Sequence, residues 1–474
     1  MALLYFRLFH IAFTIKKNSI LFQNTSTATC SIPDAMKPHV YKFGGSSLAN
    51  PERIREAIQM VRCDPKCLSV VVSAFGARFK GDLKATDLLL RYVAKIEQPR
   101  QQAKILTQVK ARFAEIAAGF EETASFDTNR YWDHMAKIFA ANKHADFFIT
   151  RGEHCMARLM ALILGFRFVD ATEFIRLERG CYLLEQSKRQ AKKIRLAETP
   201  SVVPGFYGLT LGGFVQAFQR GGSDISGAMG AELLEAETYF NCTDVNGVLD
   251  ANPDLVPNAQ TIPIMSFDEL GEMASRGASV VHSYALRPVR RARIPVIVRN
   301  TRNPEHQGTL ITRREDIPTR IPGSILGLAG RNGFLPIIIS KDGMDEEVAF
   351  LATVTRIFAD HGLNIEHIPD SRNAITVIVN GKAFRRVEKA IRNDLAKKCH
   401  PDSISIGNEL ALVCVVGAAM REHSGVAAQI LNTLASERIS VSTISQGGSE
   451  ISIVLGISND KYEAAMRALH AGLL

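Results

Sequence analysis

Two glycine pairs, each placed between an apolar run and a helix-compatible segment, constrain this sequence more than any other feature. One lies in Lys42-Phe43-Gly44-Gly45-Ser46-Ser47, directly after the β-compatible Val40-Tyr41. The other lies in Arg220-Gly221-Gly222-Ser223-Asp224, before a helical run through Leu233. Glycine turns at strand ends and helix starts expose backbone N–H groups to an anion, and a nearby lysine adds a point charge. The two pairs together predict a phosphate site in an α/β fold. Either pair alone is about as typical of an ordinary loop with a helix N-cap as of a phosphate site.

The composition indicates a globular protein of two or three domains, because 474 residues exceed one typical domain and 46% of them are hydrophobic. The net charge of +9 comes from scattered Lys and Arg with only short clusters, such as Arg287 to Arg293. This pattern favours a solvated surface and anionic small substrates, and it argues against nucleic acid as a partner. The eight cysteines lack zinc spacing. We therefore expect reduced thiols, no metal site and a cytoplasmic protein without membrane contact.

Residues 1–36 differ in kind from the rest. Met1 to Ile15 is an apolar run interrupted by Arg7 and His10, and a polar stretch follows it. The run is too short for a spanning helix and lacks the early basic region of a secretory signal. Two alternatives remain, an acid-poor transit peptide or a true start at Met36. We favour the start at Met36, because the first expected strand begins a few residues later.

Residues 37–313 alternate short apolar runs with amphipathic helices, which predicts βαβ units and a parallel sheet. The run Leu68 to Ala74 reads as a buried strand, and the loop after it carries Ser73 and then Thr86. Strand ends of this kind face the ligand crevice of a parallel sheet. Glu153 lies at the start of a later helix. A glutamate at this position either binds a ligand or simply complements the helix dipole, and the two interpretations are about equally probable. Ser73 and Thr86 also have an alternative interpretation as plain turn residues.

Beyond a linker at about 313–330 lies an internal repeat. Phe358 to Ile368 aligns with Leu434 to Ile444 at a constant offset of 76 positions. Each copy has strands and amphipathic helices around it, so we expect a βαββαβ ferredoxin-like module at 320–400 and another at 405–474. Neither copy contains converging catalytic groups, and a paired module of this kind is more typical of ligand sensing.

With these segments in place, the sequence resembles aspartokinase, a member of the amino-acid kinase family that carries paired ACT modules. The resemblance extends from Val40 to the last residue. It rests on the two glycine motifs, on Arg151-Gly152-Glu153, on Thr243-Asp244-Val245-Asn246-Gly247-Val248, and on Phe267 to Leu270 followed by Gly277 to His282. It implies a three-layer αβα sandwich followed by two ACT domains. It also implies transfer of the γ-phosphoryl group of ATP, with Mg²⁺, to the β-carboxylate of L-aspartate, the first step toward lysine, threonine and methionine.

The resemblance also implies roles for individual residues. Lys42 and Asp224 are the expected catalytic pair, and no general base is needed because the accepting carboxylate is already ionised at pH 7. Arg220 would hold the α-carboxylate of aspartate and Glu153 its α-ammonium group. The other expected aspartate-binding residues are Ser73, Thr86 and Ser223, and those expected at ATP are Lys42, Phe43, Gly44, Gly45, Gly221, Gly222, Thr243, Asp244, Leu249 and Ser279.

Three positions depart from the family pattern, all on the nucleotide side. Leu249 stands where a tyrosine is usual, Asp254 where an arginine is usual, and Ser279 where a lysine is usual. Each lost cation weakens ATP binding by ~1–3 kcal/mol if hydrogen bonds are left unmade. Arg287, Arg290 and Arg291 are candidates to replace the missing charge.

For the two C-terminal modules, the resemblance implies an amino-acid effector bound at the interface between ACT modules. The positions that resemble the family's effector site are Met344, Asn364, Ile365 and Glu366, with Asp370-Ser371 where Thr-Ser is usual. We expect a homodimer joined through these modules. Two alternatives to an aspartate kinase are another amino-acid kinase, which the paired ACT modules disfavour, and an amino-acid sensor whose nucleotide site has decayed.

Overall fold

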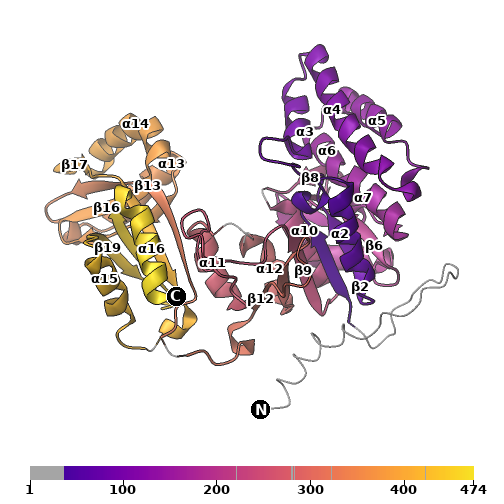
Figure 1. Cartoon of the computed structure of the whole chain (residues 1–474). Helices are drawn as coiled ribbons and strands as arrows, with labels where there is room; N and C mark the ends of the chain where they lie inside the picture. Colours follow the sequence, from indigo (N-terminus) through magenta and orange to yellow (C-terminus); the bar gives the residue numbers. More distant parts are fainter. Residues whose placement is uncertain (1–36, 220, 279–280, 282, 322, 422) are drawn as a thin grey trace.

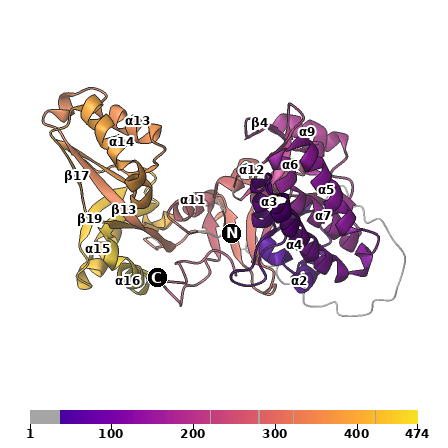
Figure 2. The ribbon, with the colours of Figure 1, turned by 90° about the horizontal axis from the view of Figure 1, so that it is seen from above.

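The computed structural model describes residues 37–219, 221–278, 281, 283–321, 323–421 and 423–474. The described chain forms two parts that lie side by side, with helix α11 (Phe267–Ser275) between them (Figures 1 and 2). The N-terminal part is built on one large sheet and the C-terminal part on another. The expectation of an α/β protein is therefore confirmed.

The N-terminal sheet has eight strands in the order β10-β12-β11-β9-β1-β2-β6-β3. Neighbouring strands are parallel except for the antiparallel pair β11 and β12. The strands are β1 (His39–Phe43), β2 (Cys67–Val72), β3 (Arg167–Phe168), β6 (Ser201–Pro204), β9 (Thr238–Thr243), β10 (Ile264–Ser266), β11 (Val296–Asn300) and β12 (Thr309–Thr312). A separate four-stranded sheet contains β4 (Arg176–Glu178), β5 (Cys181–Tyr182), β7 (Tyr207–Thr210) and β8 (Val215–Ala217).

Helices cover both faces of the large sheet, because its central strands carry apolar side chains on both sides. In β1, Val40 packs into one hydrophobic core, whereas Tyr41 and Phe43 pack into the other. The Tyr41 side is covered by α2 (Pro51–Arg62), α3 (Ala85–Ala94), α4 (Pro99–Ala118), α5 (Thr128–Asn142), α6 (Ala145–Ile149) and α7 (Arg151–Leu164). The Val40 side is covered by α8 (Ala171–Phe174), α9 (Leu184–Lys193), α10 (Gly222–Leu233) and α12 (Arg287–Ala292). This is the three-layer αβα sandwich that the family resemblance implied.

The C-terminal sheet contains two modules joined edge to edge, in the order β14-β16-β13-β18-β20-β19. The first comprises β13 (Gly327–Ser340), α13 (Phe350–Asp360), β14 (Ile365–His367), β15 (Asp370–Ser371), β16 (Ala374–Asn380), α14 (Gly381–Cys399) and β17 (Ser403–Ile406). The second comprises β18 (Leu410–Val416), α15 (Val426–Ser436), β19 (Val441–Gln446), β20 (Ser452–Ser458) and α16 (Tyr462–Leu473). Helices α13 and α15 begin 76 positions apart, as the sequence repeat predicts.

The long strand β13 belongs to both modules. Its second half, from Phe334 to Ser340, pairs with β16, and most of that half also pairs with β17. Its first half, from Gly327 to Arg331, pairs antiparallel with β18 and so fills the edge position of the second module. The two modules expected at 320–400 and 405–474 therefore share a strand, because the first half of β13 completes the sheet of the second module.

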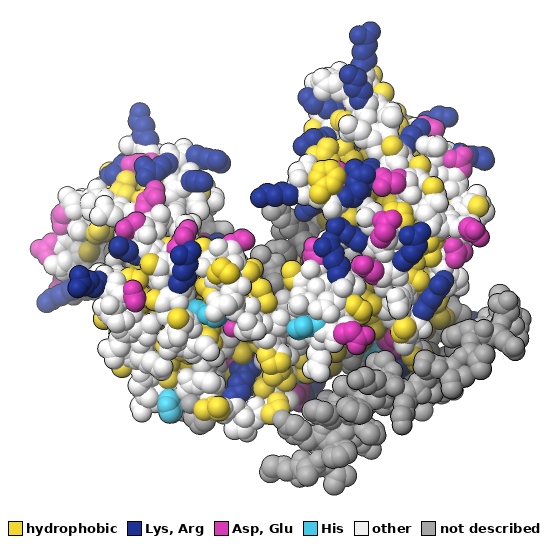
Figure 3. Space-filling view, in the orientation of Figure 1, with side chains coloured by type: hydrophobic (Ala, Val, Ile, Leu, Met, Phe, Trp, Pro, Cys, Tyr) yellow, Lys and Arg dark blue, Asp and Glu magenta, His cyan; other side chains and the backbone are white. Residues whose placement is uncertain are grey.

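The C-terminal sheet also packs against the N-terminal part. In β18 the side chains alternate, so that Val413 and Val415 face α15 and α16 while Leu412 and Cys414 join the core that contains α11. The fully buried Glu269 of α11 joins the two parts, because its carboxylate accepts hydrogen bonds from the Ala418 N–H at 2.9 Å and from Arg320. On the face drawn in Figure 3, Lys and Arg side chains are interspersed with Asp and Glu over both parts. Among the residues described, no helix has the length and apolar character needed to cross a membrane.

Candidate active site

The side chains of Lys42 and Asp224 meet at the carboxyl ends of the parallel strands. Lys42 lies two residues after Val40 in β1 and so points toward the same face, the one that α10 covers. Asp224 lies in the first turn of α10, and its Oδ1 is 2.5 Å from the Lys42 Nζ. Both side chains are largely buried, with 9% and 14% of their surface exposed. The structure thus brings the expected pair of side chains into direct contact.

Asn241 of β9 completes a triad with this pair. It lies directly opposite Lys42 in the parallel register of β1 and β9, and it is 2% exposed. Its Nδ2 donates to Asp224 Oδ1 at 3.0 Å, and its Oδ1 accepts from Lys42 Nζ at 3.5 Å. The amide therefore contacts both members of the ion pair and fixes their relative positions. The sequence analysis missed Asn241, although a polar residue in an otherwise buried strand was an available signal.

Helix α10 lies close to the sheet because its contact positions are glycines. Gly221 begins the helix at a φ of 79°, a left-handed conformation that favours glycine. A Cβ on Gly227 would lie 2.4 Å from the Tyr239 hydroxyl, which itself donates to the Asp224 backbone oxygen at 3.2 Å. The glycine motif thus positions Asp224 beside Lys42 and places the N-terminal amides of α10 at the same strand ends.

The loops after β1 and β2 are in direct backbone contact beside Lys42. The Gly76 N–H donates to Gly45 O at 2.7 Å, and a Cβ on Gly76 would lie 2.5 Å from the same oxygen. The Gly44 N–H donates to Cys242 O at 3.2 Å, so this amide is engaged within the protein. The Ser73 N–H donates to Phe43 O at 3.1 Å, which places Ser73 beside the same loop.

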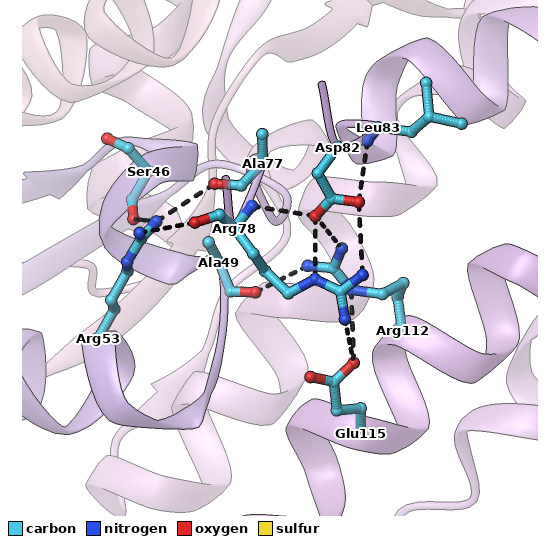
Figure 4. A network of polar contacts seen from close by, with 9 residues as sticks. All are labelled: Ser46, Ala49, Arg53, Ala77, Arg78, Asp82, Leu83, Arg112 and Glu115. Atoms are coloured by element: carbon cyan, nitrogen blue, oxygen red, sulfur yellow. Dashed lines mark hydrogen bonds and ion pairs between the residues drawn. The ribbon is translucent and has the colours of Figure 1, made fainter. Parts of the chain in front are cut away.

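Arg53 of α2 connects these two loops (Figure 4). Its Nη1 donates to Ser46 O at 3.1 Å and to Ala77 O at 3.2 Å, and its Nη2 donates to Arg78 O at 3.0 Å. One guanidinium group therefore satisfies three carbonyl oxygens from two loops. The pKa of Arg53 lies below its ordinary value because burial disfavours the charge, and Arg302 is a further positive charge nearby.

Asp82 anchors the second loop to the outer helices (Figure 4). Its carboxylate accepts from Arg78 Nε at 2.9 Å, from the Arg78 N–H at 3.0 Å and from Arg112 Nη1 at 2.8 Å. Arg112 is buried, and its Nη2 donates to Ala49 O at 2.8 Å. The hydrogen bond from Arg78, assisted by Arg112, holds the pKa of Asp82 well below its usual range. This network fixes the loop between Ser73 and Thr86.

Glu153 is a buried carboxylate that forms no ion pair with any residue in the described part of the chain. It is 3% exposed, it lies near the start of α7, and its Oε2 has no hydrogen-bond partner among the described residues. Burial raises the pKa of Glu153 from 4.5 to about 7, although the Ala74 N–H donates to the carboxylate. The neighbouring Arg151 donates instead to Phe147 O and lies over the Tyr207 ring. A buried carboxylate beside the end of β2 is suited to a ligand with a positive charge.

The other expected aspartate-side residues surround the same strand ends. Ser223 packs against Gly205 at the end of β6, where a glycine Cβ would lie 2.9 Å from the Ser223 Cβ. Thr86 lies in the first turn of α3, whose first N–H, from Ala85, donates to Phe75 O at 3.0 Å. Arg220 and Ser279 lie outside the described residues.

On the expected nucleotide side, Thr243 and Asp244 follow β9, and Asp244 is exposed. Leu249 is half-buried, and Asp254 is exposed. Two of the candidate replacement cations are engaged elsewhere: Arg291 binds Glu232 through two bonds of 2.7 Å, and Arg290 lies 2.6 Å from Asp268. Glu232 and Asp224 are at opposite ends of α10. Arg290 and Arg291 therefore do not supply the missing charge, while Arg302, exposed at the end of β11 beside Asp244, is better placed.

The expected effector residues lie together in the first module, but Glu366 already has partners. Met344 is buried in the core of that module, Ile365 packs against it, and Asn364 is exposed. The Glu366 Oε2 accepts from Arg331 Nη2 at 2.6 Å and is 3.9 Å from Arg276 Nη1. Glu366 thus connects the first module to the end of α11. Among the residues described, there is no group of three His, Cys, Asp or Glu that could hold a metal ion.

A three-layer αβα domain with a lysine and a carboxylate at its strand ends, followed by paired ferredoxin-like modules, defines a phosphotransferase with a regulatory half. Residues 37–300 match the model of the amino acid kinase family, and residues 413–473 match that of an ACT domain. Aspartokinase 3 of Bacillus subtilis is 32% identical over 446 residues, which cover 91% of this chain and 97% of that protein.

Solved structures agree with this match. A crystal structure of Clostridium acetobutylicum aspartate kinase has a TM-score of 0.83 at 30% identity, and the match covers 93% of this chain and 100% of that chain. An E. coli aspartokinase III structure in complex with aspartate and ADP shares the fold, with a TM-score of 0.74 at 24% identity and coverage of 92% and 100%. The chain belongs to the amino acid kinase family and, within it, to the aspartokinases.

Proposed function

We propose that this protein is an aspartate kinase, which transfers the γ-phosphoryl group of ATP to the β-carboxylate of L-aspartate and forms 4-phospho-L-aspartate. The observation that carries the proposal is the triad of Lys42, Asp224 and Asn241 at the carboxyl edge of the sheet. Phosphoryl transfer depends mainly on positioned charge, and a buried lysine held by two polar partners supplies a fixed cation for the transferring group. The accepting carboxylate is ionised at neutral pH and attacks without a general base.

On the aspartate side, Glu153 binds the α-ammonium group of the substrate. The support is its burial and its unpartnered Oε2, since a buried carboxylate is stabilised when a cation neutralises it. Arg220, from the same glycine motif as Asp224, binds the α-carboxylate through its two-pronged guanidinium group. Ser73, Thr86 and Ser223 form the walls of the aspartate site.

On the nucleotide side, the start of α10 and the loop after β1 hold the phosphate groups. Gly221, Gly222, Thr243 and Asp244 lie at these strand and helix ends. ATP arrives with Mg²⁺, which neutralises part of the phosphate charge. Leu249, Asp254 and Ser279 supply no cation, and we assign the compensating positive charge to Arg302.

The C-terminal half regulates this reaction by binding an amino acid at the first module. Because Glu366 already pairs with Arg331, an incoming ammonium group competes with that guanidinium group and thereby changes the contact with α11. The exposed Val348 and Leu351, with 94% and 49% of their surface accessible, suit an interface between two copies of this part. We therefore propose a homodimer joined through its ACT modules, in the cytoplasm.

Formation of aspartyl hydroxamate with MgATP tests the proposed reaction. We expect product with aspartate, none with glutamate, and a loss of at least a hundredfold in Lys42→Ala. The same measurement on Arg385→Ala, a surface change on α14, controls for nonspecific effects of removing a cation. Wild-type product no higher than that of Lys42→Ala would contradict the proposal, and product with glutamate alone would indicate a different amino-acid kinase.

A further inference from the structure

A cavity of about 490 Å³ lies where the catalytic part meets the second ACT module. Its walls come from the N-terminal half of α11, from residues 284–290, from Arg314, and from two loops of the C-terminal part that contain Ala418–Arg421 and Ser449–Ile451. Lys42, Asp224 and Glu153 are not among its lining residues. Cavities of roughly 300–1,000 Å³ are typical of small-molecule sites.

The charged groups of this cavity are mostly cationic. Four arginines line it, Arg287, Arg290, Arg314 and Arg421, whereas the lining carboxylates are Asp268 and Glu272. Asp268 neutralises Arg290 at 2.6 Å, and Glu272 accepts a hydrogen bond from Ser452 Oγ at 2.9 Å. Arg421 Nε lies 3.9 Å from a carboxylate oxygen of Glu450. Arg287 and Arg314 are therefore the lining cations with no carboxylate partner among the described residues, and they outnumber the one remaining lining carboxylate, Glu272.

Two of the arginines have contacts that leave their charge in place. The Arg287 guanidinium group lies 3.7 Å from the centre of the Tyr284 ring. Arg314 Nη2 donates to the backbone oxygen of Ala418 at 3.4 Å, which is a long hydrogen bond. Neither partner is a carboxylate, so both guanidinium groups retain donors and charge for an anion.

The remaining wall is apolar. Phe267, Leu270, Leu286 and Ile451 line the cavity, and each is at most 7% exposed. Free phosphate or sulfate fills only part of such a volume and makes no use of these side chains. A ligand with an anionic group and an apolar group can contact both the arginines and the apolar side chains of the cavity.

We propose that this cavity binds an organic anion with at least two negative charges, either a phosphate monoester or a dicarboxylate, that carries an apolar or aromatic body. Planar guanidinium groups bind both kinds of head through paired hydrogen bonds. The occupant contacts Arg287 and Arg314, and because Arg314 donates to the backbone oxygen of Ala418 in the C-terminal part, the occupant links the two parts. This site is separate from the expected effector residues, because Glu366 pairs with Arg276 just beyond the far end of α11, a helix about 13 Å long.

Binding of two small probes tests the proposal. Phenyl phosphate supplies a phosphate monoester on an aromatic body, and phthalate supplies two carboxylates on the same body. Isothermal titration at constant ionic strength measures the dissociation constant for the wild type, for Arg287→Ala/Arg314→Ala and for Arg385→Ala. We expect binding of at least one probe, a dissociation constant at least tenfold weaker in the double variant, and no change in Arg385→Ala. Binding of one probe alone identifies the head group.

Two controls make the result decisive. The Lys42→Ala variant retains the cavity, so unchanged probe binding there places the probe outside the catalytic cleft, whatever the enzyme's activity. The melting temperature without ligand shows whether the double variant is folded, which we expect because both arginines are exposed. Absence of binding by both probes, equal binding by the folded double variant, or loss of binding in Lys42→Ala alone would each overturn the proposal.

Discussion

The raised pKa of Glu153 predicts that aspartate binding and stability both depend on pH, in opposite directions. The shift from 4.5 to about 7 arises from burial and corresponds to about 3 kcal/mol for ionising this carboxyl group in the free protein. At pH 7 about half of the molecules carry the proton, and at pH 6 about nine-tenths do. The α-ammonium group of aspartate requires the ionised form, so binding at pH 7 releases about half a proton.

Calorimetric titration with aspartate measures both effects. The dissociation constant for aspartate should be nearly constant above pH 8 and should rise about tenfold for each pH unit below 7. The proton release at pH 7, obtained from buffers of different ionisation enthalpy, should approach half a proton. Glu153→Gln should bind aspartate ~10–100-fold more weakly, because a charge-assisted hydrogen bond is lost, and its affinity should no longer depend on pH in this range.

The stability effect has the opposite sign. The folded protein binds this proton more tightly than the unfolded chain, so stability is lost as pH rises from about 4.5 to about 7. Glu153→Gln removes that loss and should stabilise the fold by about 3 kcal/mol at pH 8 but by less than about 1 kcal/mol at pH 5. The exposed Glu52→Gln serves as the matched control and should change nothing. A stability difference between Glu153→Gln and the wild type that is the same at pH 5 and pH 8 would refute the reasoning.

Three further predictions concern the triad, the loop network and the nucleotide side. Asn241→Ala should lower kcat ~10–100-fold while the protein stays folded, because Asp224 loses a buried donor worth ~1–3 kcal/mol, and a kcat equal to that of the wild type would exclude a positioning role. Asp82→Ala should lower the free energy of unfolding by ~1.5–3 kcal/mol, since the buried Arg112 then keeps only the more distant Glu115, at 3.6 Å; denaturant unfolding measures this, and a loss below about 1 kcal/mol would contradict it. Arg302→Ala should raise the KM for ATP several-fold and leave the KM for aspartate unchanged, and steady-state kinetics with an unchanged KM for ATP would show that the nucleotide site is compensated elsewhere.

Local sequence rules could predict a parallel α/β sheet and glycine turns at its strand ends, whereas the αβα layers and the pairing of Lys42 with Asp224 in catalysis were expected from the family resemblance. Short apolar runs indicate strands, and a glycine turn indicates where a strand ends. The carboxyl ends of parallel strands then lie at one edge of the sheet. Lys42 and Asp224 meet for these reasons, although they lie 182 positions apart in the sequence. Asn241 is a polar residue in a buried strand, which is a local signal, but its contact with Lys42 depends on the register between β1 and β9, which no local pattern specifies.

Other features depend on contacts between distant elements. Glu366 was expected to receive an effector, but in the folded chain it pairs with Arg331 of β13, 35 positions away, and lies 3.9 Å from Arg276 at the end of α11. Arg290 and Arg291 seemed available for phosphate because their carboxylate partners, Asp268 and Glu232, lie 22 and 59 positions away in the sequence. Charge alone in a sequence does not reveal whether a side chain is already neutralised.

The shared strand β13 affects the order in which the chain acquires its structure during synthesis. Residues 327–331 leave the ribosome well before their partners at 412–416 exist, and until then this stretch is an unpaired edge that another chain could join. Closing the second module also requires a contact across about 85 positions, so its formation is slow compared with that of its local helices. Residues 405–474 alone would form a sheet without its outer strand, so the second module depends on the first for the pairing of β18.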